Sequence, residues 1–217
     1  VFTFPVHPRI VMQADYQPKL LNSFEEKLDQ LSTTGVDCCV ILNFTLELAN
    51  YSASDFITLL ADQWRVRTLL IGHDHRFGHN REEGFEEYIK YGSTHGMQVI
   101  HASSYTQGTD VVSSSKIRQL LSECKVKKAA ELLTYPYRLK GHVVSGYQIG
   151  RKLGFPTANI EVDEPFKVWP GTGVYAVWAY IKGMRYKGML SIGNRPTFDN
   201  ENIALEVHLL HFSDNIY

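Results

Sequence analysis

The sequence has little cysteine, no bias of charge and no long hydrophobic run in its 217 residues. Three cysteines, two of them adjacent at Cys38 and Cys39, do not make a disulfide framework, so we expect buried thiols and a cytoplasmic location. The 22 basic and 23 acidic residues leave a net charge of -1, which argues against a nucleic-acid partner. Because no apolar run is long enough to span a bilayer, we expect no membrane partner. The composition does not decide whether the protein self-associates.

The most informative stretch is rich in glycine. Gly146, Gly150 and Gly154 interrupt a β-like pattern, and loops of this kind let backbone N–H groups approach phosphates. Thr157 and Asn159 are two residues apart in the strand that follows, so their oxygens point to one face. Mg²⁺ accepts such hard oxygen ligands beside nucleotide phosphates. On spacing alone, a plain hairpin with two solvated polar residues explains the pattern equally well.

The first half alternates expected strands and helices, which predicts a parallel sheet in an α/β layer. Ser52 or Ser54 is expected to cap the second helix. Sites in such folds lie beyond the carboxyl ends of the strands, which draws attention to residues 72–84. The expected strands cover residues 2–4, 36–44, 68–71 and 97–101, and the expected helices cover about 23–31, 52–64 and 82–91.

A cluster of serines, Ser113, Ser114 and Ser115, opens a helix that we expect to continue to about Leu133. Serines in this position are first of all helix caps. The same N-terminus also offers N–H groups and a positive dipole end to an anion, and the basic residues that follow would add charge. Capping and phosphate binding both remain open from the pattern alone.

The pattern of hydrophobic residues changes at about Tyr135, where helical periodicity stops and short β-rich runs begin. Short strands joined by polar, glycine-rich connections predict a small antiparallel barrel. We therefore expect two domains, residues 1–134 and residues 135–217. The expected strands are 139–144, 157–162, 174–181, 185–192 and 204–212, with a turn at 181–184.

Two groups of polar residues remain. Glu206 and His208 alternate to one face of the last strand, where Glu206 is either solvated or the general base for an alcohol substrate. Arg195 follows the preceding strand and could hold phosphate or simply occupy a turn. The histidines at 73, 75 and 79 lie near Asp74, but their spacing does not fix a zinc site. A polar loop that contacts an organic substrate is the favoured interpretation.

Several stretches, in order along nearly the whole chain, resemble the prokaryotic bifunctional riboflavin kinase/FMN adenylyltransferase family, also called FAD synthetase. The stretch GHVVSGYQIGRKLGFPTANI is similar to the family's kinase signature. PGTGVYAVW, SIGNRPTF and LEVHLLHF are similar to the segments that follow it. TFPVHPR, IGHDHRFG and VSSSKIR resemble segments of the adenylyltransferase half.

The resemblance implies a nucleotidyltransferase-like, Rossmann-like α/β domain followed by a riboflavin kinase β-barrel. It implies ATP-dependent phosphorylation of riboflavin to FMN and adenylylation of FMN to FAD. In the kinase, Thr157 and Asn159 would hold Mg²⁺ and ATP phosphates under the loop of Gly146, Gly150 and Gly154. Glu206 would activate the terminal ribityl hydroxyl. In phosphoryl transfer the protein mainly positions the reactants and neutralises charge, and the loop N–H groups, the metal and the carboxylate would do this.

In the adenylyltransferase half, the resemblance implies two further sets of residues. The serine-rich segment would bind ATP phosphates, and the loop after the third strand would lie by the flavin and nucleotide site. In the kinase half, Arg195 would belong to the residues that bind flavin or substrate. The nucleotide-binding set is Ser113, Ser114, Ser115 and Arg118, and the loop set is Asp74, Arg76 and Phe77.

Three departures from the family pattern qualify these expectations. The chain has no H-x-G-H segment near its start, so as written we expect it to be inactive as an adenylyltransferase. Because Val1 begins in mid-strand and the chain stops at Tyr217, we expect truncation at both ends. His75 stands where the family commonly has an aromatic residue. The alternatives are a kinase with a vestigial first domain, or a non-catalytic flavin- or RNA-binding regulator.

Overall fold

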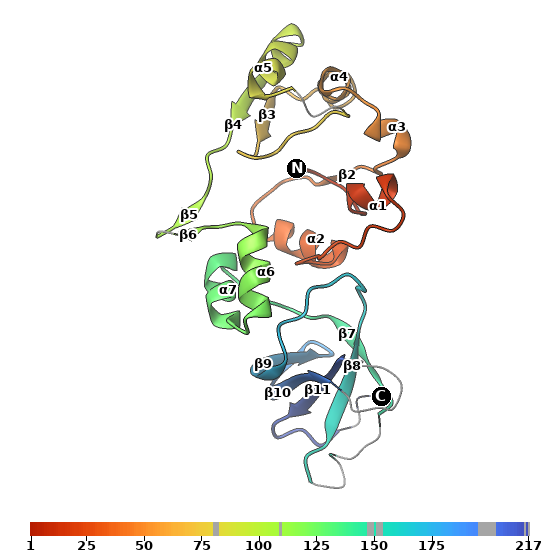
Figure 1. Ribbon diagram of the computed structural model, residues 1–217, viewed down its shortest axis with the longest axis vertical. Helices are drawn as coiled ribbons and strands as arrows, with labels where there is room; N and C mark the ends of the chain where they lie inside the picture. Colours follow the sequence, from red (N-terminus) through yellow and green to blue (C-terminus); the bar gives the residue numbers. More distant parts are fainter. Residues whose placement is uncertain are drawn as a thin grey trace. The chain divides into compact units, whose positions relative to one another are not determined.

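The computed structural model describes residues 1–79, 83–108, 110–146, 150, 154–194, 203–214 and 216. By its internal contacts the chain divides into two compact units (Figure 1). The first unit contains Val1–Pro18 and Phe24–Val112, and the second contains Lys19–Ser23 and Ser113–Tyr217. The domain boundary that we expect after residue 134 therefore falls inside the second unit, and it stays a prediction.

Strands in the first unit form parallel pairs, β1 with β2 and β3 with β4, and a short antiparallel pair, β5 with β6. The parallel direction agrees with the sequence. One continuous parallel sheet is not confirmed, because the described residues form separate pairs. The strands are β1 (Phe2–Thr3), β2 (Val40–Ile41), β3 (Thr68–Ile71), β4 (Gln98–His101), β5 (Thr106–Gln107) and β6 (Asp110–Val111).

The expected strand at 36–44 pairs over only two residues, because its partner β1 is two residues long, and Val36 and Cys38 are exposed to solvent rather than covered. The other elements of this unit are helical. They are α1 (Pro8–Met12), α2 (Phe24–Ser32), α3 (Leu46–Ala49), α4 (Ala53–Trp64) and α5 (Phe85–Thr94).

Helix α4 begins where the sequence predicts. The Ser52 hydroxyl accepts a hydrogen bond from the Asp55 N–H, and the Asp55 carboxylate accepts one from the Ser52 N–H, which completes a capping box. The Ser52 hydroxyl also donates to the Asp55 carboxylate at 2.7 Å, and this bond, together with the one from the Ser52 N–H, holds the pKa of Asp55 below its usual value. The helix buries one apolar face against the β3–β4 pair and α5. The buried residues of this core are Ala53, Ile57, Leu60, Ile71, Tyr88 and Met97.

Besides the segment Lys19–Ser23, the second unit contains two short helices, α6 (Ser114–Ser122) and α7 (Val126–Leu133). The sequence predicted one helix over this range. It is interrupted because Cys124 adopts a left-handed conformation with φ 60°, which a continuous right-handed helix excludes.

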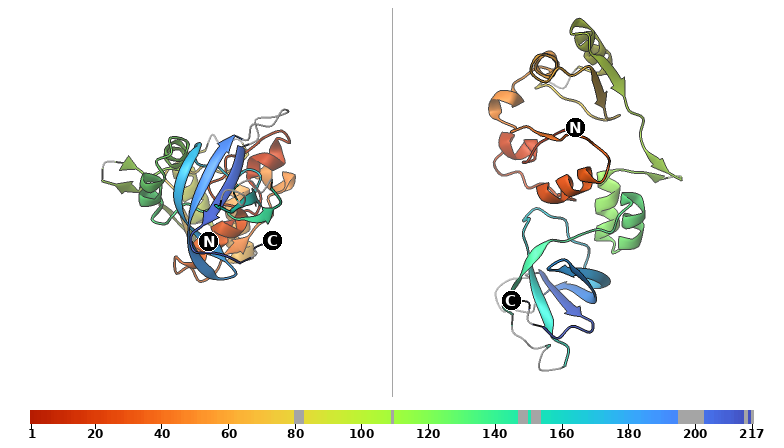
Figure 2. Two further views of the ribbon diagram at one scale, coloured as in Figure 1. Left: turned by 90° about the horizontal axis from the view of Figure 1, so that it is seen from below. Right: turned by 180° about the vertical axis from the view of Figure 1, so that it is seen from behind.

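The strands of the second unit form one antiparallel sheet in the order β7-β8-β11-β10-β9 (Figure 2). The turn between β9 and β10 has Lys182 and Gly183 at φ 51° and 80°, as the sequence predicts for a two-residue hairpin loop. In the described residues β7 and β9 are edge strands, so closure into a barrel is not confirmed. The strands are β7 (Gly141–Val144), β8 (Thr157–Val162), β9 (Gly173–Ile181), β10 (Met184–Asn194) and β11 (Ile203–Leu209).

The two faces of this sheet differ because side chains alternate along each strand. Leu190, Ile192 and Leu205 are buried on one face, where Trp169 packs against them. The other face carries Thr157 and the polar residues opposite it. Within the described ranges, none of the helices combines the length and the apolar character needed to cross a bilayer.

Candidate active sites

The pairing of β8 with β11 brings together polar residues that are far apart in the sequence. Glu206 lies opposite Asn159, and His208 lies opposite Thr157. Directly opposite residues of an antiparallel pair point to the same face, with Cβ atoms about 4.5–5.5 Å apart. The register therefore gathers these side chains in one patch.

A hydrogen bond links two members of this patch. The Thr157 hydroxyl donates to the Glu206 carboxylate, with Oγ1 and Oε2 3.4 Å apart. Asn159 is only 6% exposed, although its side chain is polar. The patch thus contains a hydroxyl, an amide and a carboxylate, all of which carry hard oxygen atoms.

The glycine-rich loop approaches this patch closely. A methyl group added at Gly146 would overlap the side-chain amide of Asn159. One added at Gly150 would collide with the Phe155 carbonyl oxygen and lie 3.4 Å from the Thr157 hydroxyl. The structure therefore brings Gly146 and Gly150 to the predicted pair, and glycine at these positions permits the approach. Residues 147–149 and 151–153 lie outside the described residues.

The turn that leads into β8 is supported by His208, which the sequence analysis did not assign to the site. Its Nδ1 donates to the Pro156 carbonyl oxygen at 2.9 Å, and its ring packs edge-on against Phe155 at 5.7 Å. The third glycine, Gly154, has φ +84°, a left-handed conformation that favours glycine. The alternation of Glu206 and His208 along the strand was the signal that pointed to this position.

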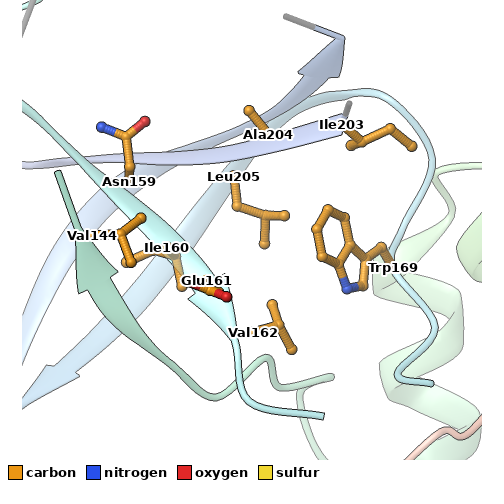
Figure 3. Close-up of a pocket in the computed structure, with 9 residues that line it drawn as sticks. All are labelled: Val144, Asn159, Ile160, Glu161, Val162, Trp169, Ile203, Ala204 and Leu205. Carbon is orange, nitrogen blue, oxygen red and sulfur yellow. The ribbon is translucent and has the colours of Figure 1, made fainter. Parts of the chain in front are cut away.

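A cavity of about 280 Å³ is lined by residues of β7, β8 and β11 and by Trp169, mostly from the buried face of the sheet. Its apolar wall includes Val162, Leu205 and Trp169, which face a common space in Figure 3. Asn159 lies at the rim and points away from the Trp169 indole (Figure 3). The cavity is therefore an apolar space that ends at one polar residue of the patch.

A second pocket, of about 120 Å³, lies in the first unit at the carboxyl ends of β3 and β4. Asp74 and Arg76 line it, together with His73 and His101. The His101 Nε2 donates to the His73 carbonyl oxygen at 3.0 Å, and its ring stacks on Phe85 at 4.5 Å. A pocket at this edge agrees with the place that the strand–helix pattern indicated.

Phe77 occupies a different environment from its neighbours in the loop. Its ring stacks on Tyr88 with centroids 4.3 Å apart and meets Phe56 edge-on at 5.3 Å. The Tyr88 hydroxyl also donates to the Phe77 carbonyl oxygen at 3.2 Å. Phe77 thus fixes the loop to the core of the first unit, and its contact with a flavin stays a prediction.

The serine-rich segment forms the start of α6, as the sequence predicts. Ser113 is the N-cap, and its hydroxyl accepts a hydrogen bond from the Lys116 N–H at 3.2 Å. Ser114 and Ser115 are exposed in the first turn. Arg118 donates from Nε to the Lys19 carbonyl oxygen at 2.7 Å. This segment belongs to the second unit, whereas the Asp74 loop belongs to the first.

Two further expectations concern Arg195 and the histidine cluster. Arg195 lies outside the described residues, so its role stays a prediction. In the ranges that the structure describes, no group of three or more histidine, cysteine or acidic side chains is arranged to hold a metal ion.

Comparison with known proteins finds two family models along the chain. Residues 1–116 match the FAD synthetase family model, and residues 133–217 match the riboflavin kinase model. The chain therefore has the two-domain architecture of an FAD synthetase with a flavokinase domain.

Three relatives named bifunctional riboflavin kinase/FMN adenylyltransferase illustrate the similarity. The chain is 34% identical to one from Listeria monocytogenes and 35% identical to one from Escherichia coli K12, in each case over 100% of this chain and 69% of the relative. It is 33% identical to one from Bacillus subtilis over the same shares. The chain belongs to the bifunctional riboflavin kinase/FMN adenylyltransferase family.

A solved structure also resembles the whole chain. It is described as the crystal structure of a macrolide-efflux protein from Streptococcus pneumoniae. The TM-score is 0.87 at 30% sequence identity, and the match covers 100% of this chain and 70% of that one. The fold described above is therefore also found in a crystal structure.

Proposed function

We propose that this protein uses ATP to phosphorylate riboflavin to FMN and to adenylylate FMN to FAD. The observation that carries the kinase half is the grouping of Thr157, Asn159 and Glu206 under Gly146. A carboxylate 3.4 Å from a hydroxyl, beside two glycines, Gly146 and Gly150, at which a side chain would collide, suits the transfer of a phosphoryl group.

Each residue of the patch has a defined task in this proposal. Glu206 accepts the proton of the terminal ribityl hydroxyl of riboflavin as its oxygen attacks the γ-phosphorus of ATP. The bond between that phosphorus and the bridging oxygen breaks, and ADP leaves. The loop of Gly146, Gly150 and Gly154 covers the nucleotide, and its backbone N–H groups bind phosphate oxygens. His208 keeps the turn before Thr157 in place.

The donor atoms of the patch fit Mg²⁺, which prefers oxygen ligands and is commonly held together with substrate phosphates. Thr157 and Asn159 would hold the ion with ATP. When bound, it would neutralise the charge of the transferring phosphoryl group. Thr157 and Asn159 would also fix the phosphates in register with Glu206.

Adenylylation of FMN is assigned to the Asp74 loop and the start of α6. Asp74 and Arg76 line a pocket at the carboxyl ends of two parallel strands, which supports a role in binding FMN. Phe77 completes the proposed flavin-binding set of this loop, and Arg195, in the kinase half, is proposed to bind flavin or substrate there. The N–H groups and hydroxyls of Ser113, Ser114 and Ser115, together with Arg118, would bind ATP phosphates at the N-terminus of α6.

We extend the proposal to fold and location. The first domain is proposed to be nucleotidyltransferase-like, on the strength of its parallel strand pairs, and the second to be a riboflavin kinase barrel, on the strength of its antiparallel sheet. A cytoplasmic location is supported by the free thiols of Cys38, Cys39 and Cys124, although the expectation of buried thiols is wrong for Cys38 and Cys124, which are exposed. Neither a kinase with a vestigial first domain nor a non-catalytic regulator is favoured by a specific observation.

The test is direct. Full-length protein is incubated with riboflavin, ATP and Mg²⁺, and FMN and FAD are separated and measured over time. We expect FMN to form first and FAD to follow. Failure to form FMN would refute the proposal, and FMN without FAD would leave only the kinase.

A further inference from the structure

A five-residue segment of the first half, Lys19–Ser23, belongs to the second unit, although the chain on both sides of it belongs to the first. Leu20 forms a parallel bridge with Lys167. The Leu20 N–H donates to the Phe166 carbonyl oxygen at 2.8 Å, and the Val168 N–H donates to the Leu20 carbonyl oxygen at 2.8 Å. The segment is therefore attached by backbone hydrogen bonds to the loop between β8 and β9.

Lys167 strengthens this attachment with its side chain. It is only 7% exposed, and its Nζ donates to the Leu21 carbonyl oxygen at 2.7 Å. The ammonium group also lies 4.7 Å from the centre of the Tyr137 ring. A buried charge is costly unless it is hydrogen-bonded, so the Leu21 carbonyl and the Lys167 ammonium hold each other in place.

The other end of the segment is attached to α6. Arg118 donates from Nε to the Lys19 carbonyl oxygen at 2.7 Å, one turn after the N-cap at Ser113. Carbonyls two residues apart in the segment are thus bound by two cationic side chains, one from α6 and one from the β8–β9 loop. Charge-assisted hydrogen bonds of this kind are about twice as strong as neutral ones.

We propose that Lys167 is a positioning residue for FMN adenylylation. It fixes the segment Lys19–Ser23, and the segment fixes Arg118 and with it the N-terminus of α6, where ATP phosphates are bound. The inference rests on the proposed function of α6. Lys167 lies in the stretch that matches riboflavin kinase, whereas Ser113 to Lys116 lie in the stretch that matches FAD synthetase. A residue of one module therefore serves the reaction of the other.

The test replaces Lys167 by methionine in the full-length protein. Mutations along such a chain of contacts change coupling by about 0.5–2 kcal/mol, which corresponds to a rise of about 2-fold to about 30-fold in the KM for ATP of FMN adenylylation. We expect the kcat and KM of riboflavin phosphorylation to be unchanged. Lys167→Arg, which keeps a cationic donor, should restore the KM. Lys127→Met, at an exposed lysine of α7, is the matched control.

Amide hydrogen exchange gives a readout that does not depend on activity. The Lys116 and Ile117 N–H groups are bonded to Ser113 in the first turn of α6. We expect both to exchange faster in Lys167→Met than in the wild type, while amides of β10 and β11 are unaffected. Faster exchange throughout the second unit would indicate general destabilisation and would overturn the proposal.

The kinetic outcomes separate the alternatives. Equal loss of both activities, or an unchanged KM for ATP in adenylylation, overturns the positioning role. If Lys167→Met does not fold, Tyr135→Phe decides, because it removes one hydroxyl, which accepts from Asn22 Nδ2 at 3.2 Å and donates to Asn22 Oδ1 at 3.4 Å. It should give the same pattern with a smaller change, and no change overturns the role. If the wild type makes no FAD, the proposed function is refuted. The positioning role of Lys167 is then tested by amide hydrogen exchange alone.

Discussion

Glu206→Gln is the sharpest test of the kinase site, because the exchange keeps the shape of the side chain and removes its basicity. General-base catalysis contributes about 10²-fold to 10⁴-fold, which is about 2.7–5.5 kcal/mol of the activation free energy. Glutamine can still accept the hydrogen bond from Thr157, whose 3.4 Å length marks it as weak. A neutral hydrogen bond contributes only about 0.5–1.5 kcal/mol, so loss of the base dominates.

The expected result is a kcat for FMN formation that is at least 10²-fold lower, with the KM for ATP within about threefold of the wild type. Initial rates are measured by separating riboflavin from FMN. Conversion of added FMN to FAD by the same preparation should be nearly unchanged, which shows that the protein is folded. Glu131→Gln, at an exposed carboxylate of α7, is the matched control.

Two outcomes would contradict the assignment. A kcat within tenfold of the wild type would mean that Glu206 is not the base. Equal loss of FMN formation and of FMN adenylylation would mean that the two reactions do not have separate sites. The larger change, Glu206→Ala, should abolish FMN formation and also leave adenylylation largely intact.

Three further predictions concern the second unit. Gly146→Ala should lower kcat/KM for ATP in riboflavin phosphorylation by about tenfold or more, because its methyl group displaces Asn159; unchanged kinetics would contradict the proposed loop. Gly171→Ala should lower the free energy of unfolding by about 1–3 kcal/mol in denaturant titrations, since its methyl group would lie 2.6 Å from the last carbonyl oxygen of α6; Gly193→Ala, in open space, is the control. Burial raises the pKa of Tyr175 to about 12. The folded state therefore favours the neutral phenol, and the unfolding free energy should fall as the pH rises from about 10 to about 12, with a flatter profile for Tyr175→Phe.

The second unit is the part of the fold that the sequence predicts best. Its strands alternate in hydrophobicity and are separated by glycine-rich turns, so local pattern and tertiary structure agree. The strand Thr157–Val162 is predicted to the residue. The period of two also predicts that Glu206 and His208 share a face. Strand register is a long-range property, however, and no local pattern places Glu206 opposite Asn159.

Other features escape sequence reasoning for identifiable reasons. The stretch Val36–Phe44 is apolar enough for a buried strand, but the pairing that decides its length depends on distant residues. The break between helices α6 and α7 depends on the left-handed conformation of Cys124, and the sequence has no glycine at this position that would predict it. The segment Lys19–Ser23 shows no helical or strand-like periodicity of hydrophobic residues. Its position is fixed by hydrogen bonds to residues about 100 or more positions away in the sequence.

The segment Lys19–Ser23 limits how the chain can be divided or joined to parts of other proteins. Since Lys19–Ser23 belongs to the second unit and its flanks to the first, the chain passes between the units three times rather than once. No single cut in the gene separates two self-sufficient parts. A cassette covering residues 113–217 would lack its docked segment, and a chimaera with a foreign first half would need an equivalent of residues 19–23. The two halves would therefore have to be exchanged as a matched pair.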